Sequence, residues 1–204
     1  MYVPLLPADE GTFRIATAAL LAGTLVVGGY FRLDARRRGG AFSRRGEPTW
    51  IFLPLRLSGV ALFAVMAVYF ARPAWAGWTT LPLPPAVRWA GAGLMLPAIA
   101  LMFWTLRSLG TNLTDTVGTR TTHTLVTHGP YRVVRHPFYL TAGMMIAAMT
   151  LLTATWPLAA VGAVTLGLLA VRTPIEEAKL VERFGDAYRD YIATTPRFLP
   201  QLRA

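Results

Sequence analysis

The chain alternates between long apolar runs and shorter segments rich in arginine. Residues 15–31, 50–71 and 89–106 form three such runs, and Arg56 is the one charged residue within them. A helix needs about 20 predominantly apolar residues to cross a hydrocarbon core of roughly 30 Å. Each run therefore predicts one membrane-spanning helix, and the three together make up the N-terminal part of the chain, residues 1–106.

A fourth apolar run, residues 138–171, contains no charge at all. As a single helix it would be roughly 50 Å long, far longer than the bilayer core. It must fold back, and Trp156-Pro157 is the expected corner, because proline breaks the helical ladder and tryptophan favours the interface. The predicted fold is all-α, with five transmembrane helices of which the last two form a helical hairpin.

A further helix is predicted after the hairpin. Thr173 suits an N-cap, Pro174 the first helical position and Glu176 the third, which together form a capping box. Apolar residues then recur at helical spacing and form one stripe: Leu180, Phe184, Tyr188 and Tyr191. This pattern is typical of an amphipathic helix, which we expect to lie on the cytoplasmic surface and to end at the segment "TTPRFLP".

Composition and charge support an integral membrane protein. Charged residues make up 15% of the chain, compared with about 25% in a soluble domain. The net charge of +10 comes mainly from residues 32–48, 107–136 and 172–204. By the positive-inside rule these segments are cytoplasmic, so the N-terminus lies outside and the C-terminus inside. We expect one domain, residues 1–204, without a nucleic-acid partner.

All three histidines lie in "HTLVTHGPYRVVRHPFY", residues 123–139. No metal site is expected there, because Gly129-Pro130 prevents one helical face and no carboxylate lies nearby in sequence. The chain has no cysteine and no serine near the histidines, which argues against nucleophilic catalysis. The glycine-rich "GAGLML" at 91–96 lies inside a predicted span and follows no strand, so it indicates close helix packing rather than dinucleotide binding.

Two distant blocks of sequence carry a family resemblance. The pattern "H-T-L-V-x-x-G-x-Y-x-x-x-R-H-P-x-Y" begins at His123, and "R-x-x-x-E-E-x-x-L-x-x-x-F-G-x-x-Y-x-x-Y" begins at Arg172 and closes on "P-R-F-L-P". Together they resemble the isoprenylcysteine carboxyl methyltransferase family, integral membrane enzymes that use S-adenosylmethionine, to which the phospholipid N-methyltransferases are similar. The resemblance covers about residues 107–200, within the predicted core at 107–204.

The resemblance implies roles for individual residues. It places Arg172 where the substrate carboxylate is met and makes Arg172 and Glu176 the expected catalytic pair. His128 matches no functional position and is expected to be a solvated loop residue. Positions that the resemblance assigns to the cofactor are His123, Thr124, Leu125, Val126, Gly129, Tyr131, Arg135, His136, Pro137, Phe138, Tyr139 and Glu176.

Helical geometry leaves the glutamate assignment open. At 100° per residue Glu177 points into the apolar stripe, whereas Glu176 lies at the edge of that stripe. Geometry therefore slightly favours Glu177 as the cofactor contact, and the resemblance favours Glu176. A purely structural account of these residues is also open, since Arg135 and Arg172 suit the positive-inside rule and Tyr139 suits the interface.

The resemblance implies methyl transfer from S-adenosylmethionine to a lipophilic acceptor. The expected reaction is carboxyl O-methylation of a prenylcysteine-like substrate. A carboxylate is already deprotonated at pH 7 and needs no general base. The acceptor would enter from the bilayer, among membrane lipids, while the cofactor would arrive from the cytoplasm. The alternatives are a lipid amine N-methyltransferase, an NADPH-dependent membrane reductase with a comparable core, and a membrane protein without catalysis.

Overall fold

The computed structural model describes residues 10–38, 48–71, 76–112 and 124–201. Within these residues the chain is helical, and the one β feature is an isolated antiparallel bridge between Thr80 and Thr155. The expected all-α class is therefore confirmed for the described part of the chain.

Four helices are long and apolar enough to cross a membrane. They are α1 (Glu10–Arg38), α2 (Thr49–Ala71), α4 (Pro85–Leu109) and α6 (Trp156–Phe184). A fifth apolar helix, α5 (Pro137–Thr153), has 17 residues and is roughly 25 Å long. The shorter elements are α3 (Ala76–Thr79), the 3-10 helices η2 (Gly110–Asn112) and η3 (Gly129–Arg132), and α7 (Asp186–Thr194).

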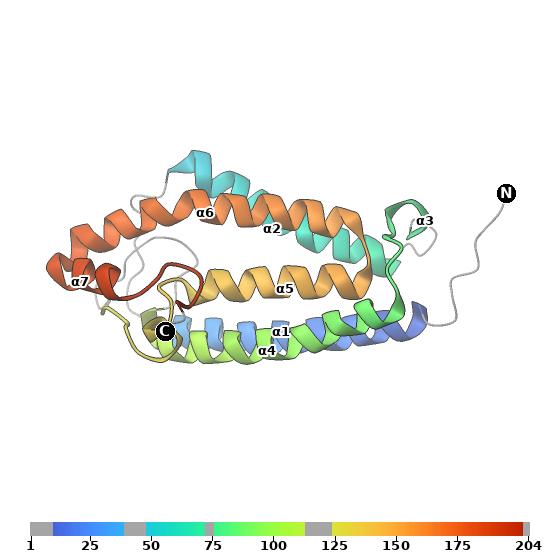
Figure 1. The fold of residues 1–204 in the computed structure, drawn as a ribbon, viewed down its shortest axis with the longest axis horizontal. Coiled ribbons are helices and arrows are strands. Elements are labelled where there is room, and N and C mark those ends of the chain that lie inside the picture. The colour runs from blue at the N-terminus through green and yellow to red at the C-terminus, as the bar shows by residue number, and fades with distance from the viewer. Residues whose placement is uncertain (1–9, 39–47, 72–75, 113–123, 202–204) are drawn as a thin grey trace.

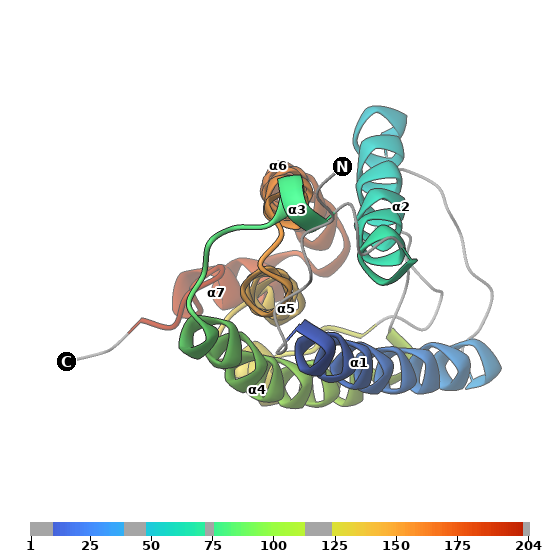
Figure 2. The ribbon, with the colours of Figure 1, turned by 90° about the vertical axis from the view of Figure 1, so that its right-hand side faces the viewer.

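The short helix α5 lies at the centre of the bundle, as the end-on view in Figure 2 shows. It packs most extensively on α4 and also contacts α6 and α1, while α2 packs on α6. Gly91 allows the close approach of α4, because a Cβ there would stand 2.7 Å from the carbonyl oxygen of Ala148 and 2.8 Å from the amide nitrogen of Leu152. Close packing is thus the role of this glycine of "GAGLML".

The chain reverses direction between α5 and α6 within two residues. Ala154 adopts a left-handed conformation (φ 52°, ψ 40°) and ends α5, and Thr155 precedes the first residue of α6. Pro157 then lies in the first turn of α6, where its missing N–H costs no hydrogen bond. The expected corner at Trp156-Pro157 therefore falls two residues too late, because the break itself is made by Ala154. Trp156 packs edge-on against Trp78 at 5.9 Å.

The predicted helix start at Thr173 is wrong. Helix α6 continues without interruption from Trp156 to Phe184, with Pro174 inside it. Thr173 is fully buried and donates its hydroxyl to the carbonyl of Leu169 at 2.8 Å instead of capping a new helix. The hydroxyl of Thr173 is thus satisfied inside α6, as is common for a threonine within a helix.

The break comes later, at Gly185, whose φ of 56° ends α6. The predicted amphipathic helix is therefore in two pieces: the last turns of α6, and α7, which carries the buried Tyr188 and Tyr191. Figure 1 shows α7 next to the end of α6 at one end of the bundle, with the following residues running back toward the start of α5. The expected end of the helix at "TTPRFLP" is confirmed, since α7 ends at Thr194.

A buried ion pair joins the helices at the opposite end of the bundle. Arg88 donates from Nη1 to Glu10 at 2.7 Å and from Nε to the carbonyl of Leu152 at 3.0 Å. The hydroxyl of Tyr69 donates to the same carboxylate at 3.2 Å, and the Arg88 guanidinium lies 3.8 Å from the ring centre of Phe13. One carboxylate therefore links α1, α2 and α4, and its arginine partner adds α5.

Candidate functional site

The end of the bundle where α7 lies also holds the start of α5 and the last turns of α6 (Figure 1). Arg135 and His136 immediately precede α5, and Tyr139 lies in its first turn. Arg172, Glu176 and Glu177 lie in the part of α6 that runs alongside. The unbroken helix α6 is what carries these three residues back to the start of α5.

Glu177 is the centre of a buried charge cluster. Its Oε1 accepts hydrogen bonds from Arg135 Nε at 3.0 Å and His136 Nε2 at 3.1 Å, and its Oε2 accepts one from Arg197 Nη2 at 2.5 Å. The Glu177 side chain is only 8% exposed. Both carboxylate oxygens are therefore engaged by the protein, which makes Glu177 a structural anchor.

Residues 195–198, here termed the C-terminal strap, lie across the start of α5. The Arg135 N–H donates to the carbonyl of Pro196 at 2.9 Å, and the His136 N–H donates to that of Arg197 at 3.0 Å. The Arg135 guanidinium also donates to the carbonyl of Thr195. These contacts place Phe198, the last residue of the strap, over the first turn of α5.

Tyr139 connects Glu176 and Arg172. Its hydroxyl donates to Glu176 Oε2 at 2.5 Å and accepts from Arg172 Nη1 at 3.2 Å. Glu176 is half-buried, in contrast to the buried Glu177. The two expected catalytic residues are thus brought together through one phenol, and this polar group is separate from the Glu177 cluster.

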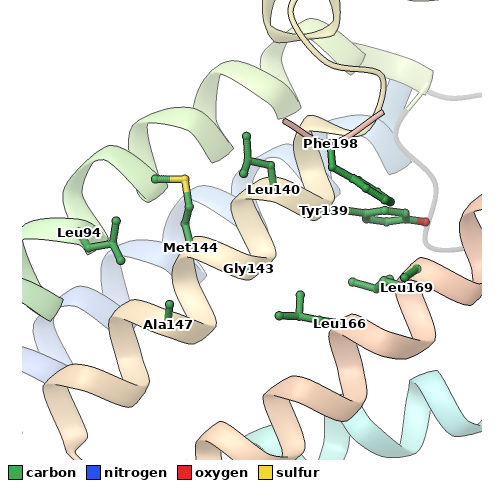
Figure 3. A pocket seen from close by; sticks show the side chains of 10 residues that line it. Leu94, Tyr139, Leu140, Gly143, Met144, Ala147, Leu166, Leu169 and Phe198 are labelled. Atoms are coloured by element: carbon green, nitrogen blue, oxygen red, sulfur yellow. The ribbon is translucent and has the colours of Figure 1, made fainter. Parts of the chain in front are cut away.

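An apolar cavity begins at the ring of Tyr139. It has a volume of about 460 Å³ and is lined by residues of α4, α5 and α6 and by Phe198. Tyr139 stacks on His136 with ring centres 5.2 Å apart, and Phe198 lies 5.7 Å from His136 and 6.5 Å from Tyr139. Figure 3 shows Tyr139 and Phe198 side by side at one end of the cavity. The same tyrosine therefore borders an apolar cavity and a polar group.

The segment before α5 is held by residues on α4, η2 and α7. Asn112 donates to the carbonyl of Thr124 at 3.3 Å and accepts from its N–H at 3.3 Å. Gly129 has φ +62°, a conformation that favours glycine, and a Cβ there would stand 2.4 Å from the Ser108 hydroxyl, which would have to move away. Tyr191 donates its hydroxyl to the carbonyl of Tyr131 at 2.5 Å.

Burial raises the pKa of two phenols in this region, those of Tyr131 and Tyr191. Burial, with the nearby Glu176 carboxylate, raises the pKa of Tyr131 well above its usual value. Burial also raises the pKa of Tyr191 to about 12, so this hydroxyl remains a donor at neutral pH. The hydrogen bond to Glu177 raises the pKa of Arg197 above its ordinary value. The ionic contacts of the strap therefore persist across the physiological pH range.

The remaining predicted residues are placed as follows. Thr124 is exposed, while Leu125 and Val126 are half-buried; Pro137 is buried in the first turn of α5. Phe138 is at the surface with 38% of its area exposed. His128 is exposed, as expected for a solvated loop residue. His123 lies outside the described residues. Among the residues that the structure describes, no group of three or more His, Asp or Glu side chains gathers as a metal site would require.

Several contributors were not assigned from the sequence. Arg197 and Phe198 form part of the closing block "P-R-F-L-P", so the block was available as a signal although no role was given to its members. Asn112 offered no signal, because a single asparagine after a predicted span is an ordinary helix-end residue. The anchoring role of Glu177 fits the geometric argument that this side chain points into the stripe.

Comparison with known proteins bears on the same region. Residues 91–182 match the model of the isoprenylcysteine carboxyl methyltransferase (ICMT) family. The family resemblance expected from the two sequence blocks is thereby confirmed, and the matched range contains α5, Tyr139, Arg172 and both glutamates. The match covers 92 of the 204 residues, and together with the apolar helices it suggests an integral membrane protein.

A curated relative matches over a shorter stretch. The nickel-cobalt-cadmium resistance protein NccN of Alcaligenes xylosoxydans xylosoxydans is 35% identical over 78 residues, which is 38% of this chain and 37% of the relative. The matched part therefore spans less than two fifths of the length of that relative. Its name describes metal resistance, and the similarity is to part of that protein only.

Proposed function

We propose that the protein transfers a methyl group from S-adenosylmethionine to a lipophilic acceptor at the membrane interface, with the carboxylate of a prenylcysteine-like molecule as the acceptor. The observation that carries this proposal is the position of Tyr139. Its ring borders the apolar cavity, and its hydroxyl contacts Arg172 and Glu176. A molecule with a hydrocarbon chain and an anionic end could place the chain in the cavity on one side of Tyr139 and the anionic end near Arg172 on the other.

The side chains present suit S-adenosylmethionine. Glu176 offers a half-buried carboxylate to an ammonium group, and the rings of Tyr139 and Phe198 offer faces that attract a cation such as a sulfonium. Glu177 is already bonded to three cationic or potentially cationic side chains. We therefore assign the cofactor contact to Glu176 and the anchoring role to Glu177. His136 holds the ring of Tyr139 in place by stacking on it.

Arg172 is proposed to orient the acceptor. A guanidinium holds a carboxylate in a defined geometry, and Arg172 already approaches the phenol that contacts Glu176. When bound, the cofactor supplies an electrophilic methyl group on a positively charged sulfur. Methyl transfer from it to a carboxylate would form a C–O bond as the C–S bond breaks, and would neutralise an anion and a cation together. No proton has to be removed from the acceptor.

Positioning and exclusion of water then account for the rate. Holding two reactants in line contributes roughly 7 to 11 kcal/mol, and neutralisation of opposite charges is favoured in a dry site. The C-terminal strap would contribute to positioning and to the exclusion of water, because Phe198 covers the first turn of α5. Phe198 is itself held in place by the contacts of Arg197 and Arg135.

We also propose the orientation of the protein in the membrane. The arginine-rich segments 32–48 and 172–204 would face the cytoplasm, which places the site where a water-soluble cofactor arrives. The acceptor would reach the same site from the bilayer, between helices.

Ligand binding tests the reaction class before any acceptor is known. Thermal unfolding of the purified protein in detergent is followed with S-adenosylmethionine and, separately, with NADPH. We expect S-adenosylmethionine to raise the unfolding temperature and NADPH to leave it unchanged. Stabilisation by NADPH alone would favour a membrane reductase and would overturn the proposal.

A further inference from the structure

The apolar cavity is a groove along α5 (Figure 3). Leu94 of α4 lies on one side, and Leu166 and Leu169 of α6 lie on the other. Gly143 and Ala147 stand one and two turns after Tyr139 on the same face of α5, so this face presents two small residues to the groove. Tyr139 and Phe198 close the end that meets the polar group.

Gly143 keeps this groove open. A Cβ at Gly143 would lie 3.8 Å from Leu166 Cδ2 and meet no other atom within 4 Å outside its own helix. This distance is an ordinary van der Waals contact, so a single methyl group at 143 would already touch α6. A larger side chain at 143 would extend from α5 toward Leu166 and take up space in the groove that both residues line.

We infer that Gly143 determines the specificity of the enzyme for the hydrocarbon chain of its methyl acceptor. This inference rests on the proposed methyl transfer and names the position that sets how bulky a chain lies beside α5. The occupant is the acceptor itself, because the groove is continuous with the polar group through Tyr139, whose hydroxyl contacts Arg172 and Glu176. A chain in the groove has its carboxylate end directed to Arg172.

A matched pair of variants tests this inference. Gly143→Leu places a side chain in the groove, and Gly167→Leu makes the same change at an exposed glycine of α6 that has nothing within 4 Å of its Cβ position. Methyl transfer is measured with two carboxylate acceptors, N-acetyl-S-farnesylcysteine and its short-chain analogue N-acetyl-S-ethylcysteine. Binding of the farnesyl compound is measured in parallel by calorimetry without the cofactor.

We expect Gly143→Leu to raise KM for the farnesyl compound about tenfold or more, since a pocket discriminates by this factor for a few methylene groups. Transfer to the ethyl compound and the affinity for S-adenosylmethionine are expected to stay at the wild-type level, and Gly167→Leu to resemble wild type throughout. An equal loss with both acceptors, or an unchanged KM for the farnesyl compound, would overturn the inference.

The binding arm separates the inference from the proposed reaction. If the wild-type protein transfers no methyl group but binds the farnesyl compound, and only Gly143→Leu loses that binding, the role of Gly143 in chain selection stands and the proposed reaction falls. If Gly143→Leu binds the farnesyl compound as the wild type does, the role of Gly143 falls whatever the reaction.

Discussion

The hydroxyl of Tyr139 lies 2.5 Å from Oε2 of Glu176, although the two residues are 37 positions apart and belong to different helices. This contact exists because α6 runs unbroken past Pro174 to the level of the first turn of α5. It connects the block at the start of α5 with the block at the end of α6, which is the region of the ICMT family match.

The hydroxyl of Tyr139 provides the first prediction. Tyr139→Phe keeps the ring that borders the groove but removes the contacts to Glu176 and Arg172, so we expect kcat to fall roughly tenfold, corresponding to about 1.4 kcal/mol for a lost hydrogen bond to a charged group. KM for a long-chain acceptor should change little. Tyr139→Leu, which removes the ring as well, should also raise that KM. If Tyr139→Phe retained full activity, the hydroxyl would have no part in catalysis.

The two neighbouring glutamates should respond differently to the same substitution. Glu177→Gln breaks a buried charge cluster and should lower the free energy of unfolding by about 3 kcal/mol. Glu176→Gln should leave stability nearly unchanged and weaken binding of S-adenosylmethionine. Thermal unfolding and calorimetric binding of both variants test this assignment, and the reverse pattern would exchange the two roles.

The difference between these glutamates also shows how far sequence reasoning reached. The 3.6-residue period correctly placed Glu177 on the inner face of the helix, and apolar length correctly located α1, α2 and α4. Periodicity carries no information about which cations come from elsewhere in the chain. The partners Arg135 and Arg197 reach Glu177 from the start of α5 and from the strap, and only the tertiary structure brings them together.

The residues around Thr173 led to a wrong prediction of a helix start, because α6 runs through this position. Threonine, proline and glutamate at this spacing are typical of a helix start, yet the same threonine bonds to Leu169 inside α6. Helix α6 packs on α5 and α2, and tertiary packing of this kind can override a local helix-start signal. The turn between α5 and α6 was placed at Trp156-Pro157, two residues too late. Alanine has no intrinsic preference for the left-handed conformation that Ala154 adopts, so the sequence carried no signal for a turn there.

The buried pair at the opposite end of the bundle should contribute to stability and not to catalysis. Arg88→Leu leaves the Glu10 carboxylate buried without its closest cation and should destabilise the protein by about 3 to 5 kcal/mol. The double variant Glu10→Leu with Arg88→Leu removes both charges and should recover part of that loss. Chemical unfolding of the three variants tests this, and a double variant less stable than Arg88→Leu would contradict it.

Helix packing at Gly91 gives a prediction with a control on the same helix. Gly91→Ala forces a methyl group against the backbone of α5, and we expect a loss of about 1 to 3 kcal/mol in stability. Gly93→Ala, two residues later, adds a methyl group where nothing lies within 4 Å and should be neutral or slightly stabilising. Equal effects of the two substitutions in thermal unfolding would argue against the close α4–α5 contact.

The central claim is tested most directly by transfer of labelled methyl groups from S-adenosylmethionine to a panel of prenylcysteine, fatty-acid and phosphatidylethanolamine acceptors. A methyl ester releases its label as methanol in mild base, whereas a methylated amine retains it. We expect base-labile label on the prenylcysteine acceptor, lowered about 100-fold or more in Arg172→Ala because the acceptor loses its orientation. Base-stable label on phosphatidylethanolamine, or no transfer to any acceptor, would contradict the proposed carboxyl methylation.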